Sequence, residues 1–259
     1  MRRSARKLRA GLISSLLLSL LFSHLAGGQS GSDFSGTWAQ MQVTSEIAKV
    51  PFIGEVTNRN ITLLRLTQIQ EGASLTVTAQ ICDIQVESGT PLVSISFPEA
   101  FIRSLGAAVK PSEIELADGR YHFFQPRFTS LRGVRLEDPV ADPLPTEADD
   151  PRIFDQDGDG HPGVSVRIAL FGFIKGEVYV VQRDWNVLRG ATDSLDRIDG
   201  LIEWGLEQVI LGASNPVLMA RSESRPDPVA EHSYFRTTRI APEMDCATIV
   251  AARELLFGR

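Results

Sequence analysis

Short runs in which apolar and polar residues alternate are the feature of this sequence that most restricts its fold. In the run "SLTVTAQI", Leu75, Val77, Ala79 and Ile81 fall on one face, and threonine and glutamine fall on the other. A period of two residues is typical of a half-buried β-strand. Similar runs follow at "SEIELA", "RYHFF", "VSVRIALFGFI" and "EVYVVQR". The pattern predicts an all-β chain.

Dipeptides that end in glycine separate these runs and predict tight turns. They are Glu71-Gly72, Ser88-Gly89, Asp118-Gly119, Lys175-Gly176 and Asp199-Gly200. Glycine adopts positive φ angles at little cost, so such pairs suit β-hairpins. Strands that are joined by short turns must be antiparallel. We therefore expect an antiparallel meander of about eight to ten strands.

The first 28 residues have the order of a secretory signal peptide. Five basic residues precede an apolar stretch, Leu12 to Phe22, and small residues follow at Ala26-Gly27-Gly28. The apolar stretch is shorter than the roughly 20 residues that a membrane span needs. We expect residues 1–28 to be removed and residues 29–259 to form one secreted or periplasmic β domain, with no transmembrane segment in the mature chain.

Removal of the signal peptide would leave an acidic protein. Residues 1–28 contain five of the 26 basic residues and none of the 32 acidic ones, so 21 basic residues remain and the net charge becomes −11. Nucleic acids and anionic membranes bind basic surfaces. The charge therefore argues against both as partners, and it favours cations.

The only cysteines, Cys82 and Cys246, both lie in the part expected to be exported. In an oxidising compartment an even pair indicates a disulfide, and two buried free thiols are the alternative. A helix is expected through "CATIVAARELLF", because Asp245 can cap its start and Gly258 follows its end. In this helix Val250, Leu255 and Leu256 would face the protein, and Cys246 would tie the helix to the strand of Cys82.

One long segment interrupts the alternation. From Glu137 to Asp159 it contains nine acidic residues and a single basic one, Arg152, together with four prolines. Proline excludes helix and central strand. Loops of this length in compact domains are usually functional or disordered. We expect an acidic loop at residues 137–160.

Three alternating aspartates near the end of this loop form a candidate metal site. Asp155, Asp157 and Asp159 stand at positions 1, 3 and 5 of a D-x-D-x-D-G sequence, and Gly160 allows a sharp turn. Calcium takes six to eight oxygen ligands, so the three carboxylates and the carbonyl of His161 at position 7 suit it. Magnesium prefers fewer carboxylates and more water. The alternative is an acidic turn in which each aspartate binds its own backbone.

These dozen residues resemble the calcium loops of EF-hands, thrombospondin type 3 repeats and FG-GAP blades. The resemblance implies a further acid at position 9 or 12, where this chain has Gly163 and Val166. Asp149, Asp150 or water would have to complete the shell. The flanking "VSVRIAL" alternates like a strand, whereas EF-hands have helices there.

A second resemblance lies in "FSGTW". Gly36 and Trp38 resemble the Gly-x-Trp signature of the first lipocalin strand, although the companion Thr-Asp-Tyr signature is absent. The resemblance implies a closed barrel whose floor is formed by the tryptophan, with Arg236 or Arg239 covering it. It also implies an apolar small ligand inside the barrel.

These patterns lead to three functional hypotheses. The first is an exported, non-catalytic β-barrel with a structural calcium site and an apolar small ligand. The second is a secreted or periplasmic hydrolase whose cleft borders the acidic loop, although no zinc motif or G-x-S-x-G sequence is present. The third is a surface interaction module, for which a filled barrel without a pocket would be the sign.

Overall fold

The computed structural model describes residues 32–50, 53–219 and 223–258. The signal peptide expected at residues 1–28 lies outside this part. Among the described residues, no helix is long and apolar enough to cross a membrane.

The described chain folds into one antiparallel sheet of eleven strands with a few short helices. The strands are β1 (Gly36–Val50), β2 (Gly54–Glu71), β3 (Ser74–Ser88), β4 (Val93–Ser96), β5 (Ala107–Ala117), β6 (Arg120–Arg132), β7 (Val164–Leu170), β8 (Ile174–Thr192), β9 (Arg197–Ala213), β10 (Glu223–Pro226) and β11 (Tyr234–Arg239). The helices are α1 (Glu99–Ser104), η1 (Pro216–Met219), η2 (Ala230–His232), α2 (Cys246–Ala251) and α3 (Arg253–Phe257). The predicted all-β, antiparallel fold is confirmed.

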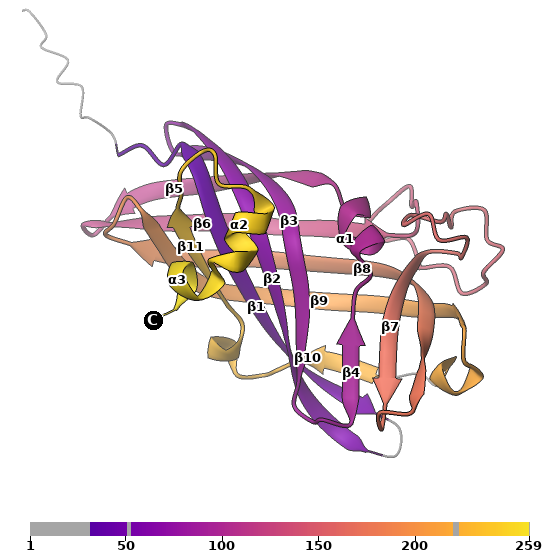
Figure 1. Cartoon of the computed structure of the whole chain (residues 1–259). Helices are drawn as coiled ribbons and strands as arrows, with labels where there is room; N and C mark the ends of the chain where they lie inside the picture. The colour runs from indigo at the N-terminus through magenta and orange to yellow at the C-terminus, as the bar shows by residue number, and fades with distance from the viewer. Residues whose placement is uncertain (1–31, 51–52, 220–222, 259) are drawn as a thin grey trace, which may run out of the picture. The chain divides into compact units, whose positions relative to one another are not determined.

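Eight strands form a hydrogen-bonded ring, but this ring is not an even barrel. It runs β1-β2-β3-β5-β6-β8-β9-β11 and closes between β11 and β1, so its neighbours follow chain order apart from the short strands. The pairing lengths differ widely: β1 pairs with β2 over all of Gly36–Val50, whereas β5 pairs with β6 only over Glu113–Ala117. Figure 1 shows β1, β2 and β3 crossing in front of β5, β6, β8 and β9. The regular closed barrel is therefore corrected to an uneven ring.

Long strands explain part of this unevenness. One edge of β8 pairs first with β7 and then with β6, while its other edge pairs with β9. Strands β7 and β4 therefore branch from the ring, and β4 lies at the edge.

The glycine pairs mark some of the turns correctly. Gly72 separates β2 from β3, and Asp118-Gly119 separates β5 from β6 with φ angles of 52° and 77°. Ser88-Gly89 ends β3 but leads to β4, which pairs with β7 instead of forming a hairpin with β3. The two remaining hairpin assignments were wrong. Lys175-Gly176 lies inside β8, because the chain turns earlier at Phe171-Gly172. Asp199-Gly200 lies inside β9, where a Cβ on Gly200 would meet the Arg189 carbonyl oxygen at 2.1 Å.

Packed side chains fill the ring at the end where Trp38 lies. Trp38 is fully buried, donates its indole N–H to the Phe34 carbonyl at 3.1 Å, and lies in one apolar cluster with residues of β2, β3, β5, β6, β8, β9 and β11. Further along the interior the contacts are polar. Gln42 donates to Gln40 at 2.7 Å, and Gln40 donates to Thr237 of β11 at 2.8 Å. This filling gives no support to an apolar ligand at this place.

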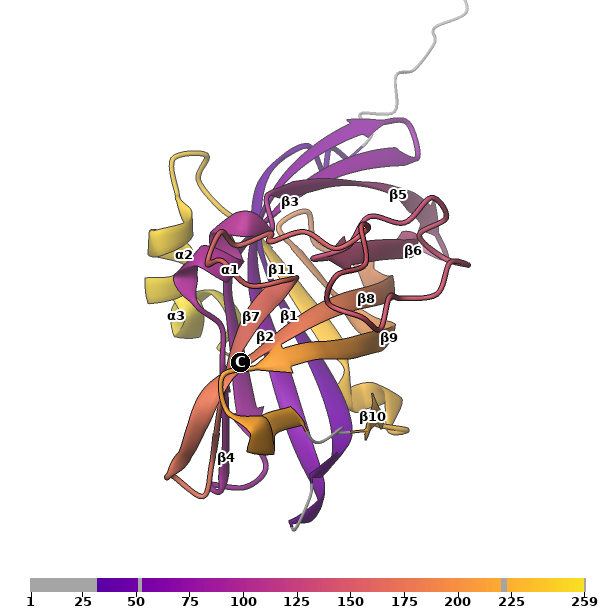
Figure 2. The same ribbon diagram turned by 90° about the vertical axis from the view of Figure 1, so that its right-hand side faces the viewer.

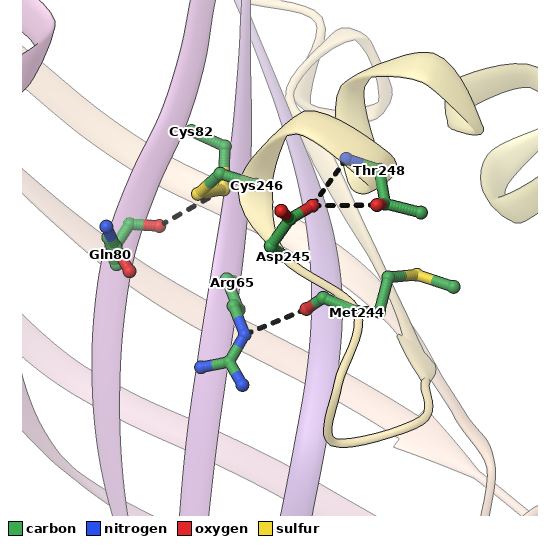
Figure 3. The surroundings of a disulfide bond; sticks show 7 residues. All are labelled: Arg65, Gln80, Cys82, Met244, Asp245, Cys246 and Thr248. Atoms are coloured by element: carbon green, nitrogen blue, oxygen red, sulfur yellow. Dashed lines mark hydrogen bonds between the residues drawn. A yellow bond between two sulfur atoms is a disulfide. The ribbon is translucent and has the colours of Figure 1, made fainter.

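A disulfide joins the C-terminal helix to the outer face of the sheet (Figure 3). Cys82 is the extra residue of a β-bulge in β3, because Leu64 pairs with Ile81 and Leu63 pairs with Asp83. A bulge re-aims a side chain out of the regular ladder, and here the side chain of Cys82 bonds to Cys246. The predicted disulfide is confirmed.

The C-terminal helix is confirmed in a shorter, broken form. Asp245 caps α2 and accepts the Thr248 N–H at 2.8 Å, but the helix ends at Ala251 and α3 begins at Arg253. The break turns the second helix, so the predicted inward Leu255 is 86% exposed. Ile249 and Phe257 are the residues buried against the sheet.

Candidate metal centre

The aspartate loop lies between β6 and β7 and is closed at its base. Asp155 forms an isolated parallel bridge with Gly163. The Gln156 N–H donates to the Gly163 carbonyl at 3.0 Å, and the Gly163 N–H donates to the Phe154 carbonyl at 3.1 Å. The residues between the two ends therefore coil back on themselves, as a metal-binding loop requires.

The three carboxylates are brought together as the sequence predicts. One oxygen each of Asp155, Asp157 and Asp159 lies within 4.8 Å of the others. This is a group that could hold a metal ion. The spacing alone does not force this result, since it also needs the positive φ angles of 73° at Gly158 and 87° at Gly160.

Asp155 organises the loop through backbone hydrogen bonds. Its carboxylate accepts the N–H groups of Gly158 at 2.7 Å, Gly160 at 2.8 Å and Asp159 at 3.2 Å. Burial alone would raise the pKa of Asp155, but these N–H groups outweigh it and hold the pKa below its usual value. Asp155 is therefore an anion at neutral pH that the loop is built around.

Asp157 is the least satisfied member of the group. Its Oδ2 accepts the Ser165 N–H at 2.9 Å, while its Oδ1 is buried and has no hydrogen-bond donor. Burial, together with the negative charges of Asp159 and Asp155, raises the pKa of Asp157 above its usual value. A buried carboxylate oxygen without a donor is costly, and a cation at this point would remove the cost.

Asp159 and His161 complete the loop in different ways. Asp159 accepts the N–H of His161 at 2.9 Å and the hydroxyl of Ser165. The imidazole of His161 stacks on Tyr179 of β8, with ring centroids 3.9 Å apart. The His161 ring therefore contacts an aromatic neighbour. The role of the His161 backbone carbonyl as a calcium ligand stays a prediction.

The structure explains why the acids at positions 9 and 12 are missing. A Cβ on Gly163 would lie 2.2 Å from the Val180 carbonyl oxygen of β8, and Gly163 has φ of +85°. Val166 is a residue of β7 and is buried in an apolar cluster that also contains Phe101 and Val178. Both residues pack where the loop joins the sheet. A carboxylate side chain at either position would therefore push the loop away from the sheet.

Asp150, one of the acids that would have to complete the calcium shell, is paired with Arg152. Asp150 binds Arg152 through both carboxylate oxygens, at 3.0 Å and 2.8 Å. The hydrogen bonds from the Arg152 side chain and N–H lower the pKa of Asp150 to about 2. Within residues 137–160, all of which are described, the gathered group consists of the three aspartates.

Side-chain anchors hold the loop against the rest of the fold. Gln156 accepts the Gly133 N–H at 2.7 Å and donates to the Ser104 carbonyl of α1 at 3.3 Å. Further back, Arg183 of β8 donates to three carbonyls of the acidic loop, the nearest being Asp142 at 2.7 Å. Leu144 packs in an apolar cluster on the outer face of β8 and β9. Figure 2 shows the acidic loop beside these strands.

The surroundings of Trp38 match the arrangement that the lipocalin resemblance implies. The guanidinium of Arg239 lies over the Trp38 ring, 4.3 Å from its centroid. Arg239 also donates to the carbonyl of Ser35 at 2.6 Å, and a Cβ on Gly36 would lie 2.9 Å from its Nη1. Arg239, rather than Arg236, therefore covers the tryptophan, and Gly36 leaves room for it.

Comparison with known proteins finds no relative for this chain: no family model, no curated protein and no solved structure matches it. The resemblances to lipocalins and to calcium loops rest on the residues around Trp38 and on residues 155–163, and no matched protein supports either of them.

A buried lysine inside the ring was not predicted from the sequence. Lys110 of β5 is only 8% exposed, and its ammonium lies over the Phe128 ring, 5.0 Å from the centroid. An ion pair between Arg132 and Asp184 lies across the same interior. Burial lowers the pKa of Lys110 from 10.5 to about 8, against the opposing attraction of Asp184. The alternation through Lys110, Ser112 and Ile114 is the sequence signal that could have identified it as an inward-facing residue.

Replacement of this lysine by an apolar residue should stabilise the protein at neutral pH. Below about pH 8 the folded protein holds a buried charge that the unfolded chain keeps in water. As the pH rises from about 8 to 10.5, the folded state loses this proton first, so the cost disappears. Lys110→Met should raise the melting temperature by a few degrees at pH 7, and the gain should shrink towards pH 10. A pH-independent difference would contradict a buried ammonium.

Proposed function

We propose that this chain is an exported, non-catalytic β protein in which Asp155, Asp157 and Asp159 hold a structural calcium ion. The observation that carries the proposal is the buried Oδ1 of Asp157, which has no donor and lies beside two further carboxylates. Three negative groups in so small a space repel one another in a folded protein unless a cation joins them.

The donor set favours calcium over other common ions. Every gathered ligand is a carboxylate oxygen, and hard oxygen ligands suit calcium and magnesium better than zinc, which prefers nitrogen and sulfur. Magnesium demands near-ideal octahedral geometry and usually binds one or two carboxylates. Calcium accepts irregular shells, so three carboxylates, the His161 carbonyl and water are a suitable set for it.

Bound calcium would act on the acidic loop rather than on a substrate. The loop at residues 137–160 contains nine acidic residues. Contacts of Gln156, Arg183 and Leu144 anchor it on the outer face of the sheet. Neutralisation of the three aspartates would remove repulsion at one end of this loop and fix its course over β8 and β9.

The interior of the ring supports an interaction module more than a small-ligand carrier. The cluster around Trp38 and the polar contacts of Gln40 fill the space in which a lipocalin-like ligand would bind. The hydrolase hypothesis has no specific observation among the described residues in its favour. We therefore propose that the protein acts through its outer surface, and that calcium holds the acidic loop in its conformation there.

Direct calcium binding tests this proposal. Exported protein, freed of metal with a chelator, should bind one calcium ion in equilibrium dialysis, with a dissociation constant of about 10⁻⁴ to 10⁻³ M as in other extracellular modules. Asp157→Asn should abolish binding, because it removes the unsatisfied carboxylate. Glu147→Gln is the matched control, since Glu147 is an exposed acid of the same loop outside the group, and it should bind like the wild type. Wild-type protein that binds no calcium at 10 mM, far above that range, would overturn the proposal.

A further inference from the structure

Three chain segments meet at one end of the sheet. They are residues 89–92 before β4, residues 171–173 between β7 and β8, and residues 214–219 after β9; together we call them the apolar end. The Phe171 N–H donates to the Leu92 carbonyl at 2.7 Å, and the Asn215 side chain donates to the Lys175 carbonyl at 3.4 Å. In Figure 1 the start of β4 and the end of β7 lie together in the lower part of the picture.

The apolar end exposes large apolar side chains and carries no charge. Phe173 is 77% exposed, Val217 53%, Leu92 43% and Met219 43%. The sequences of the three segments, "GTPL", "FGF" and "SNPVLM", contain no charged residue, although charged residues make up 22% of the chain. Two other connections each carry acidic residues, with Asp118 between β5 and β6 and Asp193 and Asp196 between β8 and β9. The apolar end is less charged than these connections.

The hairpin tip holds one of its aromatic residues in a strained conformation. Phe171 has φ of 54°, which a bulky residue rarely adopts, and its ring stacks on that of Phe173 with centroids 6.1 Å apart. Turns with positive φ normally use glycine, asparagine or aspartate. A phenylalanine kept at such a place, with its neighbour in solvent, indicates that the aromatic pair has a use.

We propose that the apolar end is a docking surface for a zwitterionic lipid bilayer. A bilayer interface receives apolar and aromatic side chains from several turns at once, and it requires no complementary charge. Phe173 and Leu92 would enter the boundary between headgroups and acyl chains. The next basic residue, Lys175, follows Phe173 by two positions and can extend its ammonium to the headgroups.

Charge selects the lipid class. Removal of residues 1–28 would leave a net charge of −11, so an anionic bilayer would repel the protein as a whole. A protein partner is the other possible occupant. Protein interfaces are typically surrounded by a polar rim and use arginine and tyrosine as anchors, whereas all three segments of the apolar end lack both residues.

Tryptophan placed at the tip reports whether the tip enters a bilayer. In Phe173→Trp, the added fluorescence should shift to shorter wavelength with phosphatidylcholine vesicles and should be quenched by brominated acyl chains. The signal of the wild type, with its three tryptophans, is subtracted. Leu255→Trp is the matched control, because Leu255 is 86% exposed on α3, away from the apolar end. Equal quenching at both positions, or none at position 173, would overturn the proposal.

Loss of the exposed ring gives a second, independent measurement. Phe173→Asp should weaken binding of the exported protein to phosphatidylcholine vesicles about tenfold or more, because the transfer of one aromatic side chain is lost. Leu255→Asp should bind like the wild type. Both variants should melt like the wild type, since both side chains are largely exposed. If Phe173→Asp leaves vesicle binding unchanged, or if it abolishes self-association of a wild type that ignores vesicles, the lipid proposal is wrong.

Discussion

Reduction of the bond between Cys82 and Cys246 should lower the free energy of unfolding by about 4–5 kcal/mol. The two cysteines are 164 residues apart, so the bond closes most of the described chain into one loop. A cross-link of this span removes much of the conformational freedom of the unfolded chain, which is where the stabilisation arises in the chain-entropy model. Melting curves with and without reductant, at fixed pH and calcium concentration, measure the difference.

Two controls separate the cross-link from other effects of the reductant. A variant in which both cysteines are replaced by serine should melt like the reduced wild type, and reductant should leave its melting temperature unchanged. Native protein should show no reactive thiol before reduction, because both cysteines are bonded. A reduced protein that melts like the oxidised one would mean that α2 and α3 are held by packing alone, through Ile249 and Phe257.

Local sequence pattern predicted the strands well because each strand buries one face. The alternation through Leu75, Val77 and Ala79 corresponds to β3, whose buried residues lie inside the ring. The two glycine pairs that lie inside strands were misread for a common reason. Gly176 lies close to side chains of residues 214–218, and Gly200 lies close to the backbone of β8. A glycine needed for packing looks the same in sequence as a glycine needed for a turn.

The closure of the sheet was less accessible to the sequence. Whether a meander becomes an even barrel depends on how far each pair of strands remains in register, and this is set by contacts between distant residues. Here β8 pairs with three strands, and the bulge at Cys82 shifts the register of β3 against β2. No local pattern marks either feature.

The candidate metal site shows the same division. The spacing of Asp155, Asp157 and Asp159 predicted that they gather, and they do. The sequence could not reveal that position 9 must be glycine, because that constraint comes from the Val180 carbonyl on another strand. The sequence also could not show that Asp150 forms an ion pair with Arg152.

Calcium should stabilise the folded wild-type protein, and the gain should depend on Asp157. At a calcium concentration 100 times the dissociation constant, binding to the folded state adds about 2.7 kcal/mol to the free energy of unfolding. Ten millimolar calcium reaches this ratio at the tight end of the affinity range of about 10⁻⁴ to 10⁻³ M. The melting temperature should rise with calcium and fall with chelator, and proteolysis within residues 137–160 should slow with calcium. Magnesium should do less.

Asp157→Asn should reverse the order of stability between the two conditions. Without calcium the variant should be at least as stable as the wild type, because it removes a buried charge that lies beside Asp155 and Asp159. With calcium the wild type should be the more stable, because only its carboxylate can bind the ion tightly. A simple acidic turn predicts no such crossing, since asparagine replaces aspartate well in turns and neither protein would respond to calcium. Melting curves of both proteins, with 10 mM calcium and with chelator, therefore distinguish an ion site from a turn at this aspartate.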